Sequence, residues 1–382
     1  MKDQPALPAK SDVTPKPLEA ADRLVTLDIL RGLALFGVMA ISVVFDFRVS
    51  IFEQFLPPHE FLSPLDAAIA RFLDDAISLK AFALFSLLFG AGLAIQFDRL
   101  PKQRRAVLLV RRLLVLFGFG LVHLVLIWNG DILTEYALAG LVVLPLLYGP
   151  RWLLAVGALA LLILYSTSYL VRLMPPPDAR SMAEHVREAR AIYANGDFLD
   201  ILKFRVREIS AIGPLHVWVF PRTLALFLTG ALVWRTSVLH RASESRWLIF
   251  GVTLAAGMAT LWVNRALASV TLAVAYGAFA IAVASTKAGL TCLGWAAPLG
   301  RMAFTNYIAQ SLIFGFTFYG YGFGLFGRLD VATALAFGVA VYVAQVIVSR
   351  WWLARYRFGP IEWLWRSLMY GRLPPMKLPV VT

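Results

Sequence analysis

The chain alternates long apolar runs with short polar and charged stretches. The apolar runs cover approximately residues 30–47, 80–97, 113–128, 131–148, 152–171, 214–234, 247–264, 267–286, 302–319 and 332–349. With some tilt, a helix over each run crosses the roughly 30 Å hydrocarbon core of a bilayer. The pattern predicts an all-α fold, a polytopic transmembrane helix bundle with about ten spans. Two pairs of consecutive runs are separated by only a few residues, so each pair is expected to form a tight helical hairpin.

Composition supports this class and excludes others. Of the 382 residues, 59% are hydrophobic and 15% are charged, whereas soluble proteins are about 45–50% apolar. The net charge of +13 comes from basic residues in short clusters between the apolar runs. Such clusters orient membrane proteins, so we expect the lipid bilayer and no nucleic acid as a partner. The single Cys292 excludes an intrachain disulfide, and the five histidines lack metal-ligand spacing, so no metal is expected.

The basic clusters also orient the predicted bundle. One crowds the connection at 99–112 and another the C-terminal region at 350–377. Both are expected in the cytoplasm, because short cytoplasmic connections carry the excess of Lys and Arg. With ten spans, the N- and C-termini are then both cytoplasmic. The segment 172–212 lies outside in this topology although it carries several arginines, since longer segments are translocated despite their charge.

The sequence predicts three consecutive parts. Residues 1–22 are rich in Pro, Lys, Ala and Asp and predict a disordered cytoplasmic tail. They are not expected to form a signal peptide, because the apolar run that follows lacks a cleavage site. Residues 23–371 predict a single transmembrane domain, and residues 372–382 a C-terminal tail.

Amphipathic helices are predicted at two places in the transmembrane domain. Within the external insertion 172–212, a capping box at 181–184 predicts the start of one helix, and the Asn-Gly pair at 195–196 predicts its end. Asp197 is placed to cap a second helix; the alternative for the whole insertion is a solvated connector. A Gly-Pro pair followed by a glutamate predicts a cytoplasmic interfacial helix over 360–370.

Polar residues on the predicted cytoplasmic side form the first group of candidates for ligand binding. Asp28 and Arg31 lie three positions apart, on one helix face, where the first apolar run begins. Charge at this depth costs roughly 2.5 to 3.5 kcal/mol, so the two side chains should pair or contact something polar. Alternatively, Asp28 caps the helix and Arg31 reaches a lipid phosphate. Asn306 and Gln310 also share a helix face, which suits either a polar ligand or hydrogen bonds between helices.

Candidates for chemistry lie on the predicted external side. His123 precedes the tight turn at 128–131, and its near-neutral pKa lets a histidine both take and return a proton. Asp131 and Glu135 start the next run and are placed to orient or charge it, so these three residues are the candidate catalytic group. The alternative is a histidine that only forms structural hydrogen bonds. Arg222 follows Pro221, which predicts a broken helix with a ligand-binding cation beside a cavity.

An ordered set of segments resembles a known family. The segments are RLVTLDILRGLALFGVMAIS, LFSLLFGAGLAIQ, RRLLVLFGFGLVHLVLIWNGDILTEYALAGL, LGRMAFTNYIAQSLI and FRFGPIEWLWRSLMYG. Together they resemble the YeiB-like family of bacterial multispanning membrane proteins, a family defined by a domain of unknown function. This resemblance implies a multi-pass protein of the bacterial plasma (inner) membrane and does not by itself imply an activity.

The opening Leu-Asp-x-x-Arg-Gly is also similar to the start of the heparan-α-glucosaminide N-acetyltransferase group and, more distantly, of other membrane-bound acyltransferases. Such enzymes take an acyl group from cytoplasmic acyl-CoA and deliver it to a hydroxyl or amine on the far side. The similarity implies acyl-CoA as co-substrate and a small-molecule, glycan or lipid-linked acceptor. It places Asp28 and Arg31 at the donor end and makes His123 the candidate base.

Two further functions fit the same residues. In a proton-coupled transporter of a small polar or anionic solute, Arg222 and Arg31 bind the anion, and His123, Asp131 and Glu135 relay protons. A purely structural or assembly role is the third possibility, and it explains the buried charges least well.

Overall fold

The structure is a computed structural model that describes residues 25–56, 63–167, 178–236, 238 and 244–378. Within these ranges its regular elements are all helices, apart from one isolated bridge between Tyr356 and Lys377. The predicted all-α fold is therefore confirmed. The tail predicted at 1–22 lies outside the described residues, as do residues 168–177, where a predicted span ends and the predicted insertion begins.

The helices and their bounds are α1 (Val25–Ile41), α2 (Pro64–Phe72), α3 (Lys80–Arg99), α4 (Arg105–Val122), α5 (Leu133–Leu146), α6 (Arg151–Ser166), α8 (Ala179–Asn195), α9 (Phe198–Arg235), α10 (Arg246–Ala259), α11 (Arg265–Ala284), α12 (Lys287–Leu293), α13 (Ala297–Arg301), α14 (Ala303–Phe318), α15 (Val331–Leu353) and α16 (Pro360–Tyr370). Short 3-10 segments are η3 (Ile51–Phe55) and η6 (Gly294–Ala296), and π-helical segments are η2 (Ser42–Phe47), η4 (Leu73–Ile77) and η5 (His123–Ile127).

Several helices have the length and composition of membrane spans. Among the described residues, six helical segments are long and apolar enough to cross a bilayer: Val25–Phe47, Pro64–Arg99, Arg105–Ile127, Phe198–Arg235, Arg265–Ala284 and Val331–Leu353. Three shorter apolar helices, α5, α6 and α10, accompany them. These helices are those of a multi-pass membrane protein.

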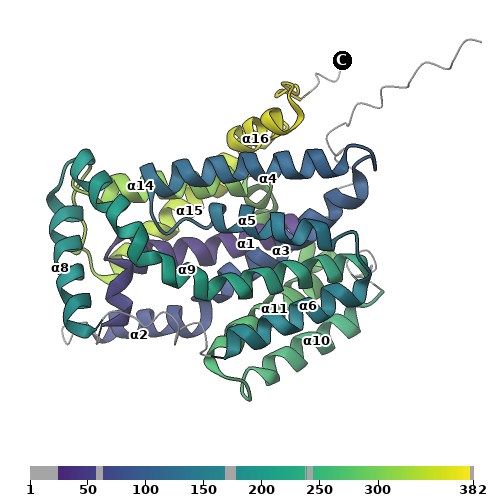
Figure 1. Cartoon of the computed structure of the whole chain (residues 1–382), viewed down its shortest axis with the longest axis horizontal. Helices are drawn as coiled ribbons and strands as arrows, with labels where there is room; N and C mark the ends of the chain where they lie inside the picture. The colour runs from purple at the N-terminus through teal and green to yellow at the C-terminus, as the bar shows by residue number, and fades with distance from the viewer. Residues whose placement is uncertain (1–24, 57–62, 168–177, 237, 239–243, 379–382) are drawn as a thin grey trace, which may run out of the picture.

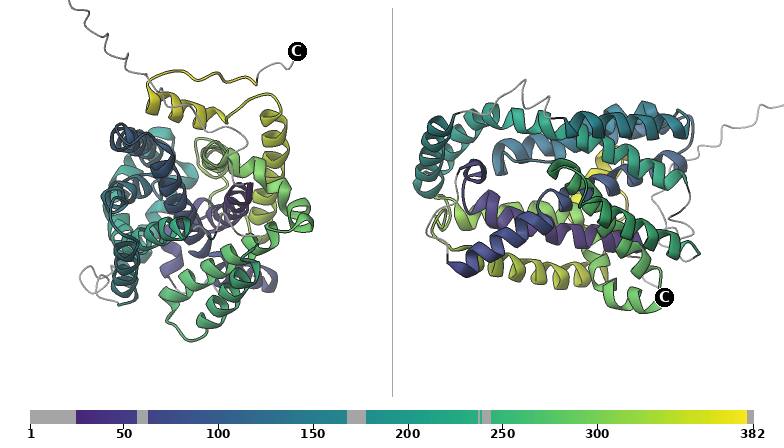
Figure 2. Two further views of the ribbon diagram at one scale, coloured as in Figure 1. Left: turned by 90° about the vertical axis from the view of Figure 1, so that its right-hand side faces the viewer. Right: turned by 90° about the horizontal axis from the view of Figure 1, so that it is seen from below.

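α1 is the central helix of the bundle. Over an 18-residue stretch of α1 and η2, 83% of the residues are buried, a larger share than in any other of the six long segments. Figure 2 shows α1, in purple, surrounded by the other helices. Most long helices run along a common direction, while α8 stands across one end of the bundle (Figure 1). α16 lies at the edge, against α4 and α14. One large hydrophobic core joins α1 with α3, α4, α5, α9, α14 and α15.

The helix boundaries differ from the predicted ones at two places. α4 begins at Arg105, ahead of the predicted run at 113, so Arg111 and Arg112 belong to the helix and not to the connection. α9 continues from Phe198 to Arg235 through two prolines. The predicted separate second amphipathic helix and the predicted break at Pro221 are therefore wrong. Proline is tolerated in apolar helices where neighbouring groups satisfy the freed backbone.

The predicted amphipathic helices are otherwise found. α8 ends at Asn195, as the Asn-Gly pair predicts, but Asp178 caps its start by accepting from the backbone N–H groups of Arg180 and Ser181, in place of the predicted capping box. Asp197 caps the next helix as predicted. α16 covers Pro360–Tyr370 and matches the predicted bounds.

Close packing of α13 on α1 depends on a glycine. A Cβ at Gly300 would lie 1.7 Å from the carbonyl oxygen of Asp28 and 2.6 Å from its carbonyl carbon. These are backbone atoms of a buried helix and have no room to move. The contact brings Arg301 next to the start of α1.

We therefore expect Gly300→Ala to destabilise the protein by about 1–3 kcal/mol, because the new methyl group forces α13 away from α1. The matched control is Gly251→Ala in α10, where a Cβ meets nothing within 4 Å. Thermal unfolding of the purified protein measures both variants. Equal midpoints for the two variants would contradict this account of the α1–α13 contact.

Candidate functional site

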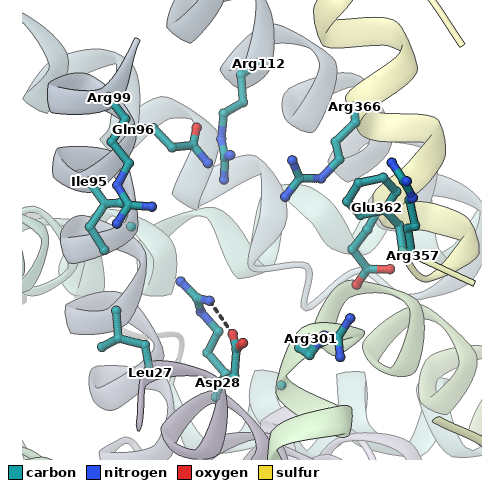
Figure 3. A pocket seen from close by; sticks show the side chains of 14 residues that line it. Leu27, Asp28, Ile95, Gln96, Arg99, Arg112, Arg301, Arg357, Glu362 and Arg366 are labelled. Carbon is teal, nitrogen blue, oxygen red and sulfur yellow. Dashed lines mark hydrogen bonds and ion pairs between the residues drawn. The ribbon is translucent and has the colours of Figure 1, made fainter. Parts of the chain in front are cut away.

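A cavity of about 150 Å³ opens between α1, α3, α4, α13 and α16, and charged side chains line it (Figure 3). Its polar lining consists of Asp28, Arg31, Gln96, Arg99, Arg112, Arg301, Arg357, Glu362 and Arg366. The six arginines outnumber the two carboxylates three to one. Figure 3 shows Arg99, Arg112 and Arg366 pointing from three different helices toward the same space. This arrangement suits a ligand that carries several negative charges.

Asp28 and Arg31 form the ion pair that their spacing predicts. Arg31 Nη1 donates to Asp28 Oδ1 over 3.0 Å. The Arg31 side chain is 31% exposed and the Asp28 side chain 12%, so the carboxylate faces the protein and the guanidinium faces the cavity. Only one of the arginine's donor nitrogens is used by this bond, which leaves the others to a ligand.

Arg112 is held by aromatic contacts instead of a carboxylate. Its guanidinium carbon lies 4.0 Å from the ring centroid of Trp365, and the Trp365 indole N–H donates to the Arg112 carbonyl oxygen over 2.9 Å. α16 is thereby fixed against α4. A cation over an indole ring is stabilised electrostatically while its N–H groups still point outward in the guanidinium plane.

Glu362 closes the cavity on the α14 side. Its Oε1 accepts from the backbone N–H groups of Phe304 at 2.8 Å and Thr305 at 3.0 Å, and the Thr305 hydroxyl donates to Oε2. Glu362 therefore caps the first turn of α14, a position that favours a negative charge. Burial raises the pKa of this carboxyl, and the hydrogen bonds from Thr305 and the backbone partly offset the increase.

Asn306 and Gln310 connect α14 to α15. Asn306 donates to the Ser349 hydroxyl over 2.9 Å, and Gln310 donates to Gln345 Oε1 over 2.7 Å. Gln345 in turn donates to the Asn306 backbone oxygen. Neither Asn306 nor Gln310 lines the cavity. These contacts match the alternative of hydrogen bonds between helices, and a ligand-binding role stays a prediction.

His123 and Asp131 meet in the interior across the α4–α5 hairpin. His123 Nδ1 lies 2.9 Å from Asp131 Oδ1, and both side chains are fully buried. The two atoms are at ion-pair distance but lack the alignment of a hydrogen bond. The other carboxylate oxygen, Oδ2, accepts from the backbone N–H and the hydroxyl of Thr134 at 2.7 and 2.8 Å, so Asp131 is fixed. His123 Nε2 has no hydrogen-bond partner, and the Tyr307 ring of α14 lies over the imidazole at 5.1 Å between centroids.

The local backbone at His123 is π-helical. η5 continues α4 over His123–Ile127 and ends where the Trp128 N–H donates to the His123 carbonyl oxygen over 2.8 Å. Insertions of this kind in α-helices occur often at functional sites. This turn aims the imidazole at Asp131.

Glu135 does not join the His123–Asp131 pair. Its Oε2 lies 3.0 Å from His216 Nδ1, and its Oε1 accepts from the Thr223 hydroxyl. The structure thus brings two of the three predicted catalytic side chains together and gives the third to a second histidine on α9. His216 was missed in the sequence, where it lies among apolar residues with no ionisable neighbour nearby except Arg222.

A further polar network beneath α8 was also missed. Glu208 on α9 accepts from Asn129 and from the Tyr193 hydroxyl, both at 2.6 Å, and its other oxygen lies 2.8 Å from His185 Nε2. Burial raises the pKa of Tyr193 well above its ordinary value. Every oxygen of Glu208 is partnered, so this network ties α8 to the end of the bundle. In the sequence, the one sign of this network is an acidic residue, Glu208, at a position that the amphipathic pattern places on the buried face of its helix.

Arg222 is buried in α9, as expected for a residue in the middle of a long apolar helix. Its side chain is 2% exposed, and its Nε and Nη1 have no hydrogen-bond partner. It does not line the arginine-rich cavity. Among the residues that the structure describes, no group of three or more His, Cys, Asp or Glu side chains is arranged to hold a metal ion.

Comparison with known proteins places the chain in a family. Residues 213–372 match the model described as "Protein of unknown function (DUF418)". The chain is 30% identical over 393 residues to the uncharacterised protein YxaH of Bacillus subtilis (strain 168), with 94% of this chain and 98% of that protein covered. It is also 30% identical over 389 residues to the uncharacterised protein YeiB of Escherichia coli (strain K12), with 91% and 96% covered.

A third relative, from Bacillus acidopullulyticus, is an uncharacterised 39.9 kDa protein that is 26% identical over 379 residues. No solved structure matches the chain. The matched region contains α13 and α16, which build one side of the cavity. Because it matches this family model and is 30% identical to two of its members over almost their whole length, the chain belongs to the DUF418 family of YeiB-like proteins.

Proposed function

We propose that the protein is a membrane-bound acyltransferase that moves an acyl group from acyl-CoA to a hydroxyl or amine of an external or lipid-linked acceptor. The observation that carries the proposal is the cavity lined by six arginines. Guanidinium groups bind phosphates with paired hydrogen bonds, and coenzyme A carries its phosphates at one end of a long flexible arm. We assign the phosphates of acyl-CoA to Arg31, Arg112 and Arg366.

The flexible arm of acyl-CoA is expected to extend from the cavity toward His123. Arg112 and His123 lie eleven residues apart on one helix, which corresponds to about 16 Å of rise. The first turn of α14 touches both places, because Glu362 at the cavity accepts from the Thr305 N–H and the Tyr307 ring of the same helix lies over His123. A thioester at the end of the arm would therefore approach His123 while the phosphates stay at the cavity.

His123 is the base in this proposal. Asp131 lies 2.9 Å from Nδ1, and a small rotation of the imidazole that aligns Nδ1–H with this carboxylate would hold the ring in the tautomer whose Nε2 accepts a proton. As the acceptor oxygen or nitrogen attacks the thioester carbonyl carbon, Nε2 takes its proton. The carbon–sulfur bond then breaks, and the protonated imidazole returns the proton to the leaving thiolate of coenzyme A. Asp131 stabilises the charged imidazole between these two steps.

The proposed membrane arrangement follows from the same assignment. About ten spans place both termini in the cytoplasm of a bacterium, with the protein in the inner membrane. The cavity then opens toward cytoplasmic acyl-CoA, because Asp28 lies in the first turn of α1 and Arg366 in the C-terminal helix. The His123–Asp131 pair lies deeper, toward the external acceptor.

A proton-coupled transporter of a small polar or anionic solute is the second candidate. Two pairs of histidine and carboxylate favour it: the buried His123 with Asp131 and the partly exposed His216 with Glu135. Such pairs suit a proton relay in a membrane. In this case the anion would be bound by Arg31 and Arg222.

Removing an arginine from the cavity should weaken binding of coenzyme A. We expect Arg31→Gln and Arg366→Gln each to raise the Kd about tenfold or more, since charged hydrogen bonds to phosphate are lost. Arg180→Gln is the control, because this α8 side chain is 89% exposed and pairs only with Glu184. Titration calorimetry with coenzyme A measures all three, and unchanged affinity in both cavity variants would exclude the cavity as the donor site.

Removing the base should stop transfer without stopping donor binding. With acetyl-CoA as the probe, we expect His123→Ala to lower the rate of acceptor-dependent thiol release by about 10²–10⁴-fold, while its affinity for coenzyme A stays that of the unaltered protein. Thiol release at the unaltered rate would rule out His123 as the base. Solute uptake into proteoliposomes driven by a pH gradient, without thiol release, would decide for the transporter.

A further inference from the structure

A second polar site lies apart from the arginine-rich cavity, between α6 and α9. It contains two buried polar side chains that lack partners. Arg222 on α9 is 2% exposed and Tyr165 on α6 is 1% exposed. Arg222 Nε and Nη1 and the Tyr165 hydroxyl have no hydrogen-bond partner. The guanidinium carbon lies 5.8 Å from the Tyr165 ring centroid, so the unpartnered groups are neighbours.

Neither the Arg222 donors nor the Tyr165 hydroxyl has a partner among the neighbouring side chains that the structure describes. The carboxylate on the adjacent α5, Glu135, already accepts from His216 at Oε2 and from Thr223 at Oε1. The contact of the Arg222 guanidinium with the Tyr165 ring does not use the N–H donors of Arg222, because these donors lie in the guanidinium plane. Leaving the hydrogen bonds of buried groups unmade is unfavourable. Two such groups side by side, on different helices, point to an acceptor that binds both.

The chemistry of these donors defines the ligand. An arginine fork and a tyrosine hydroxyl together match a carboxylate or phosphate, which offers several acceptor oxygens and a negative charge for the buried cation. A neutral ligand would leave that cation without a counter-charge in an apolar bundle.

Two partly exposed side chains lie next to this buried pair. The His216 side chain is 33% exposed, and Trp218, which packs on Tyr165 with 5.0 Å between ring centroids, is half-buried. Pro214 and Pro221 flank this stretch of α9. Each proline removes a backbone hydrogen bond of the helix, so α9 is held by fewer backbone hydrogen bonds on both sides of His216 and Trp218.

We propose that Arg222 and Tyr165 form a binding site for a single oxyanion group, a carboxylate or a phosphate, that enters past His216 and Trp218. The source is either a free small anion or the headgroup of an anionic lipid. The site uses none of the residues that the proposed acyltransferase assigns to acyl-CoA or to its base, so it can be tested independently of that activity.

The test uses thermal unfolding of the purified full chain. Arg31→Gln serves as the background in every sample, so that anions bound at the arginine-rich cavity contribute less. Inorganic phosphate, acetate and phosphatidylglycerol in detergent micelles are titrated, with phosphatidylcholine as the lipid control. Arg222→Met and Tyr165→Phe are compared with Arg207→Gln, which alters an arginine of the same helix that is 65% exposed.

We expect at least one anionic probe to raise the unfolding midpoint to a plateau. Arg222→Met should abolish this rise, Tyr165→Phe should raise the half-saturating concentration about threefold to tenfold, and Arg207→Gln should change nothing. A rise with phosphate or acetate identifies a soluble ligand, and a rise with phosphatidylglycerol alone identifies a lipid headgroup. Without a probe, Arg222→Met should unfold no earlier than the background, because it removes an unpartnered buried charge.

Three results would overturn the proposal. The first is that none of the anionic probes raises the midpoint. The second is that the rise survives in both Arg222→Met and Tyr165→Phe. The third is that Arg222→Met unfolds early without a probe while Tyr165→Phe binds the probe normally, which would make Arg222 a purely structural residue.

Discussion

Ionisable side chains inside a bundle of apolar helices must be neutralised or hydrogen-bonded, and this constraint organises the structure. Each buried carboxylate at the candidate sites has a partner: Asp28 has Arg31, Asp131 has His123 and Thr134, and Glu362 has the first turn of α14. Burying such a charge unpaired costs several kcal/mol. The partners come from different helices in most cases, so the charges also fix how the helices pack.

The cavity and the histidine pair depend on the same helices. α4 carries Arg112 at the cavity and leads into His123. The first turn of α14 is capped by Glu362 at the cavity, and the same helix places Tyr307 over the imidazole. A change in the position of either helix would alter both places. The two places therefore act as ends of one structural unit, which is what transfer from a donor to an acceptor at different depths requires.

Much of this could be predicted from the sequence where the signal is local. Apolar runs gave the long helices, an i, i+3 spacing gave the Asp28–Arg31 pair, and a tight hairpin gave the contact of His123 with Asp131. The rest depends on contacts distant in sequence. Glu135 selects His216, which lies 81 positions away, and no pattern in the chain identifies that choice.

Tertiary contacts also override local signals in the helices themselves. Pro221 predicts a break, yet α9 stays helical because its neighbours in the bundle enclose it. α12 and α13 are too short for an apolar period to reveal them, although α13 supplies Gly300 and Arg301 to the cavity.

The central claim is that the arginine-rich cavity holds the phosphates of an acyl donor. A density map of the protein purified with saturating coenzyme A tests it most directly. The account predicts nucleotide density between α1, α4 and α16, with phosphates next to Arg31, Arg112 and Arg366. An empty cavity under these conditions, or coenzyme A bound elsewhere on the protein, would contradict it.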